Sequence, residues 1–158
     1  MTSPRHEIHQ LQTLHPFLYH PINNVREREY TPNWHEQVEI LQCYEGEGYV
    51  RCDTEYVPFT AGTVVVANPS VVHVVGSKSY ACYRCLIIDS SFFHENGVHV
   101  ESLSFEQSFQ DPVFFSVMES LAAEYTQLKP NSLLQTLSIR THVLQLIYLL
   151  CRDHTVRQ

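Results

Sequence analysis

The chain has 158 residues and is 44% hydrophobic, which is ordinary for one globular domain with a single core. Ten Lys and Arg residues stand against 17 Asp and Glu residues, so the formal net charge is -7. The basic residues are also scattered, which argues against a surface built to grip a nucleic-acid phosphate backbone.

No stretch approaches the ~18 to 20 consecutive apolar residues of a membrane span, so we expect a soluble protein with no membrane partner. The five cysteines are an odd number without a signal peptide, which favours free thiols in the cytoplasm over a disulfide framework. Cys82 and Cys85 have CxxC spacing within an apolar run that we predict to be a strand. Residues three apart on a strand face opposite sides, which disfavours a shared zinc or redox site.

Residues 1–16 are polar and are predicted to form a flexible N-terminal arm. Polar and apolar residues alternate weakly over Val25–Tyr30, which is expected to form the first strand of the barrel. Thr31-Pro32-Asn33 then interrupts this strand. Further strands are predicted at about 36–44, 48–52, 55–58, 63–67, 71–75 and 80–88. Gly46-Glu47-Gly48 is expected to form a tight hairpin between the first two of these. Short strands at this density are typical of a jelly-roll sandwich or barrel.

The last part of the sequence changes to a helical period. Asp89-Ser90-Ser91 offers N-cap side chains for a short helix that ends near Asn96-Gly97. Asp111-Pro112 predicts the start of an amphipathic helix that closes at Lys129-Pro130. We expect this helix to cover the barrel.

A second long helix, capped by Asn131-Ser132, has a wide apolar surface. One stripe on it consists of Leu133, Leu137, Arg140, Leu144, Ile147 and Cys151. The surface is widened by Leu134, Val143, Leu146 and Leu150. This pattern fits packing against the barrel and also fits a helix–helix dimer contact. The predicted dimer interface consists of Leu133, Leu137, Arg140, Leu144 and Ile147.

A polar group of side chains is expected inside the barrel. Alternate side chains of a strand share one face, so His35 and Glu39 point into the same space. His73 follows the Asn68-Pro69-Ser70 turn and can reach them. Two imidazoles and a carboxylate can ligate zinc, nickel or iron, and they can also form a hydrogen-bonded pocket for an organic ligand.

Two further residues, Tyr30 and Arg84, are candidates to line this pocket. Trp34 offers a ring for stacking on a sugar or aromatic effector, although its strand parity, opposite to that of His35, fits packing outside the barrel equally well. The predicted ligand-binding set is therefore His35, Glu39, His73, Tyr30 and Arg84, with no catalytic residue.

The order and spacing of these residues resemble the two motifs of the cupin superfamily, and especially the sensor domain of AraC-type transcription regulators. The resemblance covers about residues 17–152 and rests on the pair His35 and Glu39, the glycines Gly46 and Gly48, Gly62 before a hydrophobic strand, Pro69 with His73, and the helical C-terminal third. Metal-binding cupins usually begin the first motif with His-x-His, and Asn33 stands at the first of those positions here. The usual four-ligand set is thus reduced to His35, Glu39 and His73.

The resemblance implies a mainly β fold with C-terminal α structure. A cupin-like double-stranded β-helix (jelly-roll) barrel at residues 17–98 would bind an effector, and a two-helix antiparallel hairpin at 99–158 would serve dimerisation. The implied partners are a small molecule, with a sugar as one candidate, and a second copy of the chain. DNA would be contacted only through a helix-turn-helix domain, which this chain does not include. The chain would then be either a regulator cut at the interdomain linker or a lone sensor. No enzyme activity and no cofactor are expected; a divalent transition metal, if present, would be held by His35, Glu39 and His73.

Two other classes of function stay open. A stand-alone metal-dependent cupin enzyme of the isomerase or dioxygenase type would use His35, Glu39 and His73 as metal ligands. A metabolite-storage or scaffold cupin would bind its ligand without regulating transcription. Continuation of the reading frame into a helix-turn-helix domain would decide for the regulator.

Overall fold

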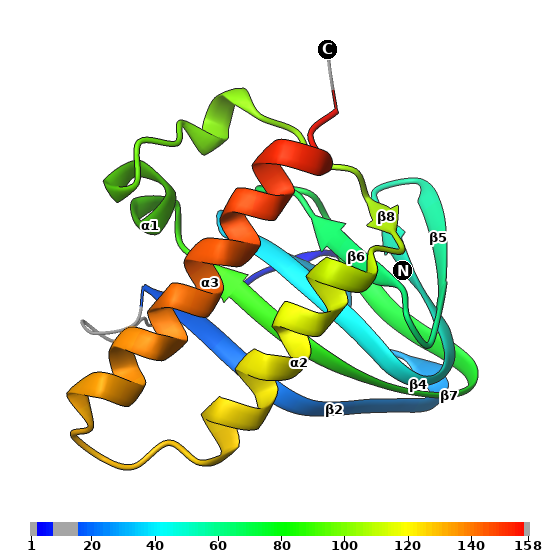
Figure 1. The fold of residues 1–158 in the computed structure, drawn as a ribbon. Helices are drawn as coiled ribbons and strands as arrows, with labels where there is room; N and C mark the ends of the chain where they lie inside the picture. Colours follow the sequence, from blue (N-terminus) through cyan, green and yellow to red (C-terminus); the bar gives the residue numbers. More distant parts are fainter. Residues whose placement is uncertain (1–2, 8–15, 157–158) are drawn as a thin grey trace.

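Two long antiparallel strands form the centre of the structure, a computed structural model that describes residues 3–7 and 16–156 (Figure 1). Strand β4 (Val38–Cys52) pairs with strand β7 (His73–Ile88) along nearly its whole length. The other strands are β1 (Arg5–His6), β2 (Phe17–Glu29), β3 (Asn33–Trp34), β5 (Glu55–Thr60), β6 (Val64–Ala67) and β8 (Ser108–Phe109). β2 pairs with β7, whereas β6 and β5 pair with the first and second halves of β4.

Two long helices, α2 (Pro112–Thr126) and α3 (Leu133–Asp153), form an antiparallel hairpin across one face of the strands (Figure 1). A short helix, α1 (Ser90–Glu95), and a 3-10 turn, η1 (Val100–Ser102), precede them. The helices start as the sequence predicts, because the Asp89, Asp111 and Ser132 side chains accept hydrogen bonds from backbone N–H groups of the first turns. The predicted fold class, a mainly β barrel followed by a helical hairpin, is confirmed.

Strand alternation divides the apolar residues into two cores. Along β4, Val38 and Ile40 pack in the core beneath the helices, whereas Leu41 and Cys43 pack in the core inside the barrel. The core beneath the helices joins strand residues to α1, α2 and α3. It therefore spans the predicted boundary at residue 98.

The glycines at 46 and 48 do not form the predicted hairpin. They lie within β4, where the pairing with β7 shifts register on both sides of Gly46, and the chain turns only at Asp53-Thr54. The predicted strands 36–44 and 48–52 are accordingly one strand, as are 71–75 and 80–88. Gly46 has φ +80°, a left-handed backbone conformation that glycine adopts readily. This conformation occurs in β-bulges as well as in turns.

The bulge predicts a specific cost for Gly46→Ala. A Cβ at this position would lie 2.0 Å from the Tyr80 carbonyl oxygen, so strand β7 would have to shift. Gly97 is the matched control because it has φ +79° and nothing within 4 Å of a built Cβ. Chemical denaturation should show that Gly46→Ala lowers the free energy of unfolding by roughly 2 kcal/mol, and Gly97→Ala by about half as much. Equal losses would mean that the close approach to Tyr80 is unimportant.

Helix α3 combines a buried face with an exposed one. By length and composition it is the one helix among the described residues that could cross a membrane, with a mean hydropathy of 1.2. The sequence has no continuous apolar run of that length, so apolar runs alone do not predict this property of α3. Its buried residues, which include Ile139, Val143 and Leu150, pack into the core beneath the helices, as expected for an amphipathic core helix.

The predicted N-terminal arm is described only in part. Residues 1–2 and 8–15 lie outside the described residues. Within the arm, Arg5 and His6 pair in parallel with Asn33 and Trp34, so strand β1 adds to the edge formed by β3. This pairing brings Glu7 next to Asn33, whose side-chain amide donates a hydrogen bond to the Glu7 carboxylate at 3.0 Å.

Candidate functional site

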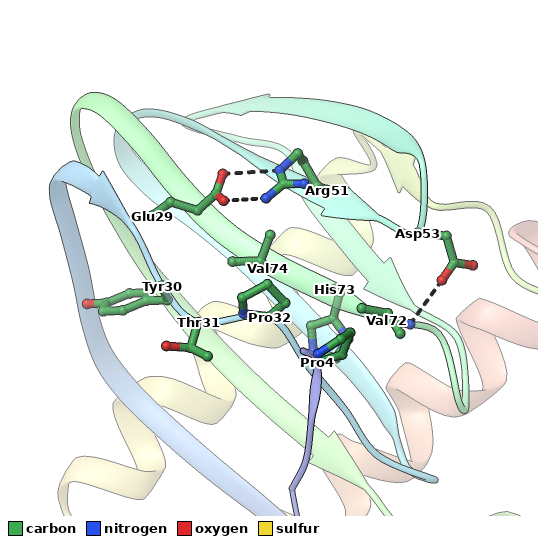
Figure 2. A pocket seen from close by; sticks show the side chains of 10 residues that line it. All are labelled: Pro4, Glu29, Tyr30, Thr31, Pro32, Arg51, Asp53, Val72, His73 and Val74. Carbon is green, nitrogen blue, oxygen red and sulfur yellow. Dashed lines mark hydrogen bonds and ion pairs between the residues drawn. The ribbon is translucent and has the colours of Figure 1, made fainter. Parts of the chain in front are cut away.

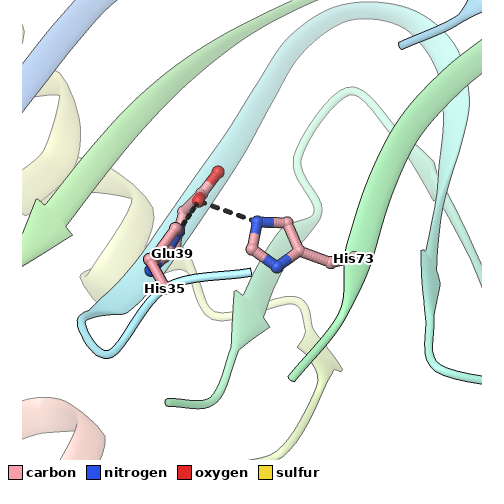
Figure 3. Close-up of side chains that lie close together, drawn as sticks. All are labelled: His35, Glu39 and His73. Carbon is pink, nitrogen blue, oxygen red and sulfur yellow. Dashed lines mark hydrogen bonds and ion pairs between the residues drawn. The ribbon is translucent and has the colours of Figure 1, made fainter. Parts of the chain in front are cut away.

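Glu39 holds two histidines at the centre of the candidate site (Figure 3). Its Oε2 atom lies 2.7 Å from His35 Nε2 and 3.0 Å from His73 Nε2. Glu39 lies near the start of β4 and His73 is the first residue of β7, while His35 precedes β4. All three are at most 7% exposed. The structure thus brings together the three residues that the sequence pattern singled out.

Each imidazole lies between two hydrogen-bond acceptors. His35 Nδ1 is 3.1 Å from the Gln37 carbonyl oxygen, and His73 Nδ1 is 2.9 Å from that of Val71. A carbonyl oxygen only accepts, so each Nδ1 carries a proton. Each Nε2 therefore faces the Glu39 carboxylate either with a second proton or with a lone pair directed at a cation. The arrangement suits protons or a metal ion at the same position.

Burial is the largest single influence on the pKa of Glu39 and raises it. The hydrogen bonds and charge interactions with His35 and His73 together outweigh burial and hold this pKa well below its usual range. Burial is the largest single influence on the pKa of His73 and lowers it, but the contacts with Glu39 and the Val71 carbonyl contribute to a net rise of this pKa. The favoured state pairs a carboxylate with an imidazolium. Cys85 Sγ lies 3.3 Å from Glu39 Oε1, and burial followed by the Glu39 charge raises the pKa of this thiol, so it stays a neutral donor.

Two cavities adjoin this cluster. An inner chamber of about 180 Å³ includes Glu39, His73 and Cys85 in its walls. An outer pocket of about 520 Å³ opens beside it, and Figure 2 shows its lining, including the ion pair between Arg51 and Glu29. The two cavities share the lining residues Tyr30, Thr31, His73 and Val74. A ligand wider than the inner chamber would therefore extend past His73 into the outer pocket.

The remaining predicted pocket residues have different positions. Tyr30 lines both cavities, and its hydroxyl donates to the Asn24 carbonyl oxygen. Arg84 does not line either of them: it lies on the helix-facing side, where it pairs with Glu119 of α2 and bonds Gln42. Register explains the difference, since the inward residues of this part of β7 are the odd-numbered ones.

The sequence interpretation missed Cys85, which shares strand parity with the inward residue Ile87 and could have been found from it. It also missed Tyr83 and Glu7 among the chamber's lining residues, and it named Asn33 only as the residue at the position of the absent fourth ligand. Trp34 stacks on the His6 ring at 4.1 Å, so β1 provides its stacking partner.

A second candidate surface lies on the outer side of α3. Leu133, Leu137 and Leu144 from the predicted dimer interface are 68%, 50% and 39% exposed, and Leu134 and Tyr148 extend the surface. Two other residues of the predicted dimer interface lie elsewhere. Ile147 is only 2% exposed and belongs to the core, and Arg140 lies over the Phe92 ring of α1 and pairs with Glu95 at 3.9 Å. An α-helix has 3.6 residues per turn, which places the Ile147 side chain on the side of α3 that faces the barrel.

A barrel with a buried His-Glu-His cluster and a helical hairpin on its outer face defines a cupin-type ligand-binding domain. More particularly, the chain belongs to the family described as AraC-like ligand binding domain, whose family model matches residues 15–150. Comparison with curated proteins gives no match.

Several solved structures are similar to part of this chain at low identity. A protein from Photorhabdus luminescens is 20% identical over 48% of this chain and 65% of that chain, with a TM-score of 0.44. A cupin 2 conserved barrel domain protein from Salinispora arenicola is 19% identical over 57% of this chain and 77% of its own, with a TM-score of 0.46. A predicted oxalate decarboxylase from Thermotoga maritima is 19% identical over 42% of this chain and 64% of its own, with a TM-score of 0.39.

Proposed function

We propose that this chain is the effector-sensing and dimerisation domain of an AraC-like transcription regulator. The observation that carries the proposal is the buried cluster of His35, Glu39 and His73 beside two adjoining cavities, in a chain that belongs to the AraC-like ligand binding domains. A small polar molecule, with a sugar as one candidate, would enter through the outer pocket and contact the cluster. The domain acts in the cytoplasm and catalyses no reaction.

The ligand proposal is tested by a thermal-shift screen of sugars and small acids, followed by calorimetric titration of each hit. His73→Gln should weaken binding at least roughly tenfold, because a hydrogen bond to a charged group contributes about 1.5 to 3 kcal/mol. Arg84→Met is the control, since Arg84 lies on the helix-facing side, and it should leave the affinity unchanged. A hit whose affinity is insensitive to His73→Gln, or equally sensitive to both variants, would bind elsewhere.

The dimer would form through the exposed face of α3, and a helix-turn-helix domain outside this chain would contact DNA. A symmetric contact buries the same leucines twice, once from each copy. The net charge of -7 supports a role in which this domain itself does not bind DNA. An effector changes the regulator's state only if it binds two arrangements of the dimer with different affinity.

A divalent transition metal is the second candidate occupant, and the orientation of the two rings favours it. Both Nδ1 atoms face backbone carbonyls, which leaves both Nε2 atoms directed at Glu39, and metal-binding histidines are commonly oriented this way. The three ligand atoms lie within 4.8 Å of one another. A bound metal would supply Lewis acidity, as the alternative isomerase or dioxygenase function requires.

We nevertheless expect purified protein to carry substoichiometric transition metal or none. Asn33 stands at the sequence position of the fourth ligand of metal-binding cupins, and both imidazoles and the Cys85 thiol already contact the Glu39 carboxylate. Elemental analysis after purification without added metal measures this directly. One tightly held ion per chain in the wild type, absent from His35→Ala, would favour the metal-dependent enzyme over the sensor.

A further inference from the structure

The loop at residues 68–72, between β6 and β7, contacts both histidines of the cluster through its backbone. The Ser70 N–H donates to the His35 carbonyl oxygen at 2.8 Å, and the Val71 carbonyl accepts from His73 Nδ1. Ser70 has φ +63°, a left-handed conformation that is unfavourable for residues other than glycine. A displacement of either histidine therefore acts on a loop whose backbone is already strained.

Asn68, the first residue of this loop, attaches it to a distant segment. Its Nδ2 donates to the Phe105 carbonyl oxygen at 3.1 Å, and its Oδ1 accepts from the Phe105 N–H at 2.9 Å. The side-chain amide thus satisfies both polar groups of one backbone residue. An amide side chain offers the donor and the acceptor on two separate atoms, as this pair of bonds requires. Phe105 itself is 1% exposed and packs against Phe93, which fixes its position.

The same segment is paired with the chain that follows α3. Phe105 forms an antiparallel bridge with Thr155, the Glu106 N–H donates to the His154 carbonyl at 2.9 Å, and the Val156 N–H donates to the Ser104 carbonyl at 2.7 Å. Figure 1 shows the end of α3 beside the chain that leads into β8. Residues 104–106 therefore lie between the loop at 68–72 and the C-terminal end of α3.

We propose that Asn68 is a positioning residue that couples the state of the His35–Glu39–His73 cluster to the C-terminal end of α3. The route runs from the His73 imidazole and the His35 backbone through the loop at 68–72, across the Asn68–Phe105 pair, and into residues 154–156. It rests on the proposed function only in taking the cluster as the sensing site. Since α3 carries the exposed leucines, the coupling would let a change inside the barrel alter how that face is presented.

The coupling is measured by a double-mutant cycle read out by hydrogen exchange at single amides. Glu39→Gln perturbs the cluster, and Asn68→Ala removes the link. Asn96→Ala is the matched control, because the Asn96 side chain also bonds a backbone carbonyl, that of Phe92, but Asn96 lies at the C-terminal end of α1. The amides of Glu106 and Val156 report the C-terminal end, and the Leu41 amide on β4 reports global unfolding.

We expect Glu39→Gln to accelerate exchange at Glu106 and Val156 roughly fivefold relative to Leu41, which corresponds to loosening about one hydrogen bond. In the Asn68→Ala background this acceleration should disappear, and in the Asn96→Ala background it should persist. His73→Gln provides a second cluster variant in case Glu39→Gln folds poorly. An acceleration of equal size with and without Asn68, or none from either cluster variant, would overturn the proposal. No effector enters the experiment, so failure to find a ligand leaves its outcome unchanged.

Discussion

Glu39→Gln is expected to lower the free energy of unfolding by about 3 kcal/mol, because removing one member of a buried ion pair leaves its partner's charge uncompensated. The buried partners are His35 and His73, both held against Oε2 of Glu39. For a chain of this size the loss corresponds to a fall of roughly 6 to 12 °C in melting temperature. Chemical denaturation of protein treated with a chelator measures the effect without a contribution from metal.

The pH dependence of this loss follows from two opposite pKa shifts. The pKa of Glu39 is depressed, so its contribution is fully present above the ordinary value of 4.5 and is lost as the pH falls through the folded-state pKa. The pKa of His73 is raised, so its contribution is fully present below the ordinary value of 6.5 and is lost as the pH rises through the folded-state pKa. The difference between wild type and Glu39→Gln should therefore be largest between about pH 4.5 and 6.5.

Glu119→Gln is the matched control for the same change of charge. Glu119 pairs with Arg84 on the helix-facing side, and its side chain is 45% exposed. A pair this accessible contributes at most about 1 kcal/mol, so this variant should stay close to wild type across the pH range. A loss for Glu39→Gln that is constant from pH 5 to pH 9 would show that the imidazolium does not contribute.

The inward position of Glu39 could be predicted from the sequence because the period of a strand is two and a short run of β4 has no irregularity. Leu41 and Cys43 follow Glu39 on the inner face as that period requires. The turn at Asn68-Pro69-Ser70 allows His73 to reach the pair, but only the cupin resemblance indicates that its strand lies beside β4. Pairing partners are set by the tertiary fold, and Glu39 is in fact opposite Ala67 and Ile87.

Arg84 shows where the same argument fails. The sequence predicts two separate strands, 71–75 and 80–88, so the parity of His73 is not carried through to Arg84. In the single strand β7 the inward residues are odd-numbered at both ends, which places Arg84 on the opposite face. The two glycines predict a turn, because the sequence indicates that a left-handed backbone is permitted there but not whether the chain reverses. Ile147 could not be separated from Leu144 for a related reason. Both fall on one wide apolar surface, and only the packed position of the barrel decides which part is covered.

Leu137→Glu combined with Leu144→Glu is expected to weaken self-association at least roughly a thousandfold, equivalent to about 4 kcal/mol. In a symmetric contact the two substitutions place four carboxylates in one apolar interface, and each loses water without gaining a partner. Because both leucines are at least 39% exposed, the monomer should keep its stability to within about 1 kcal/mol. Analytical ultracentrifugation measures the association, and circular dichroism with chemical denaturation measures the fold.

Ile147→Ala is the control that separates a dimer face from a core face on the same helix. Ile147 packs in the core beneath the helices, so its truncation should cost about 2 to 5 kcal/mol of folding free energy. Its effect on association should be small in protein that remains folded, because its side chain is covered by its own chain. If the wild type sediments as a monomer at tens of micromolar, α3 does not mediate a dimer. If the double leucine variant loses its β-sheet signal, the outer face of α3 supports the barrel, and the separation of the two faces is wrong.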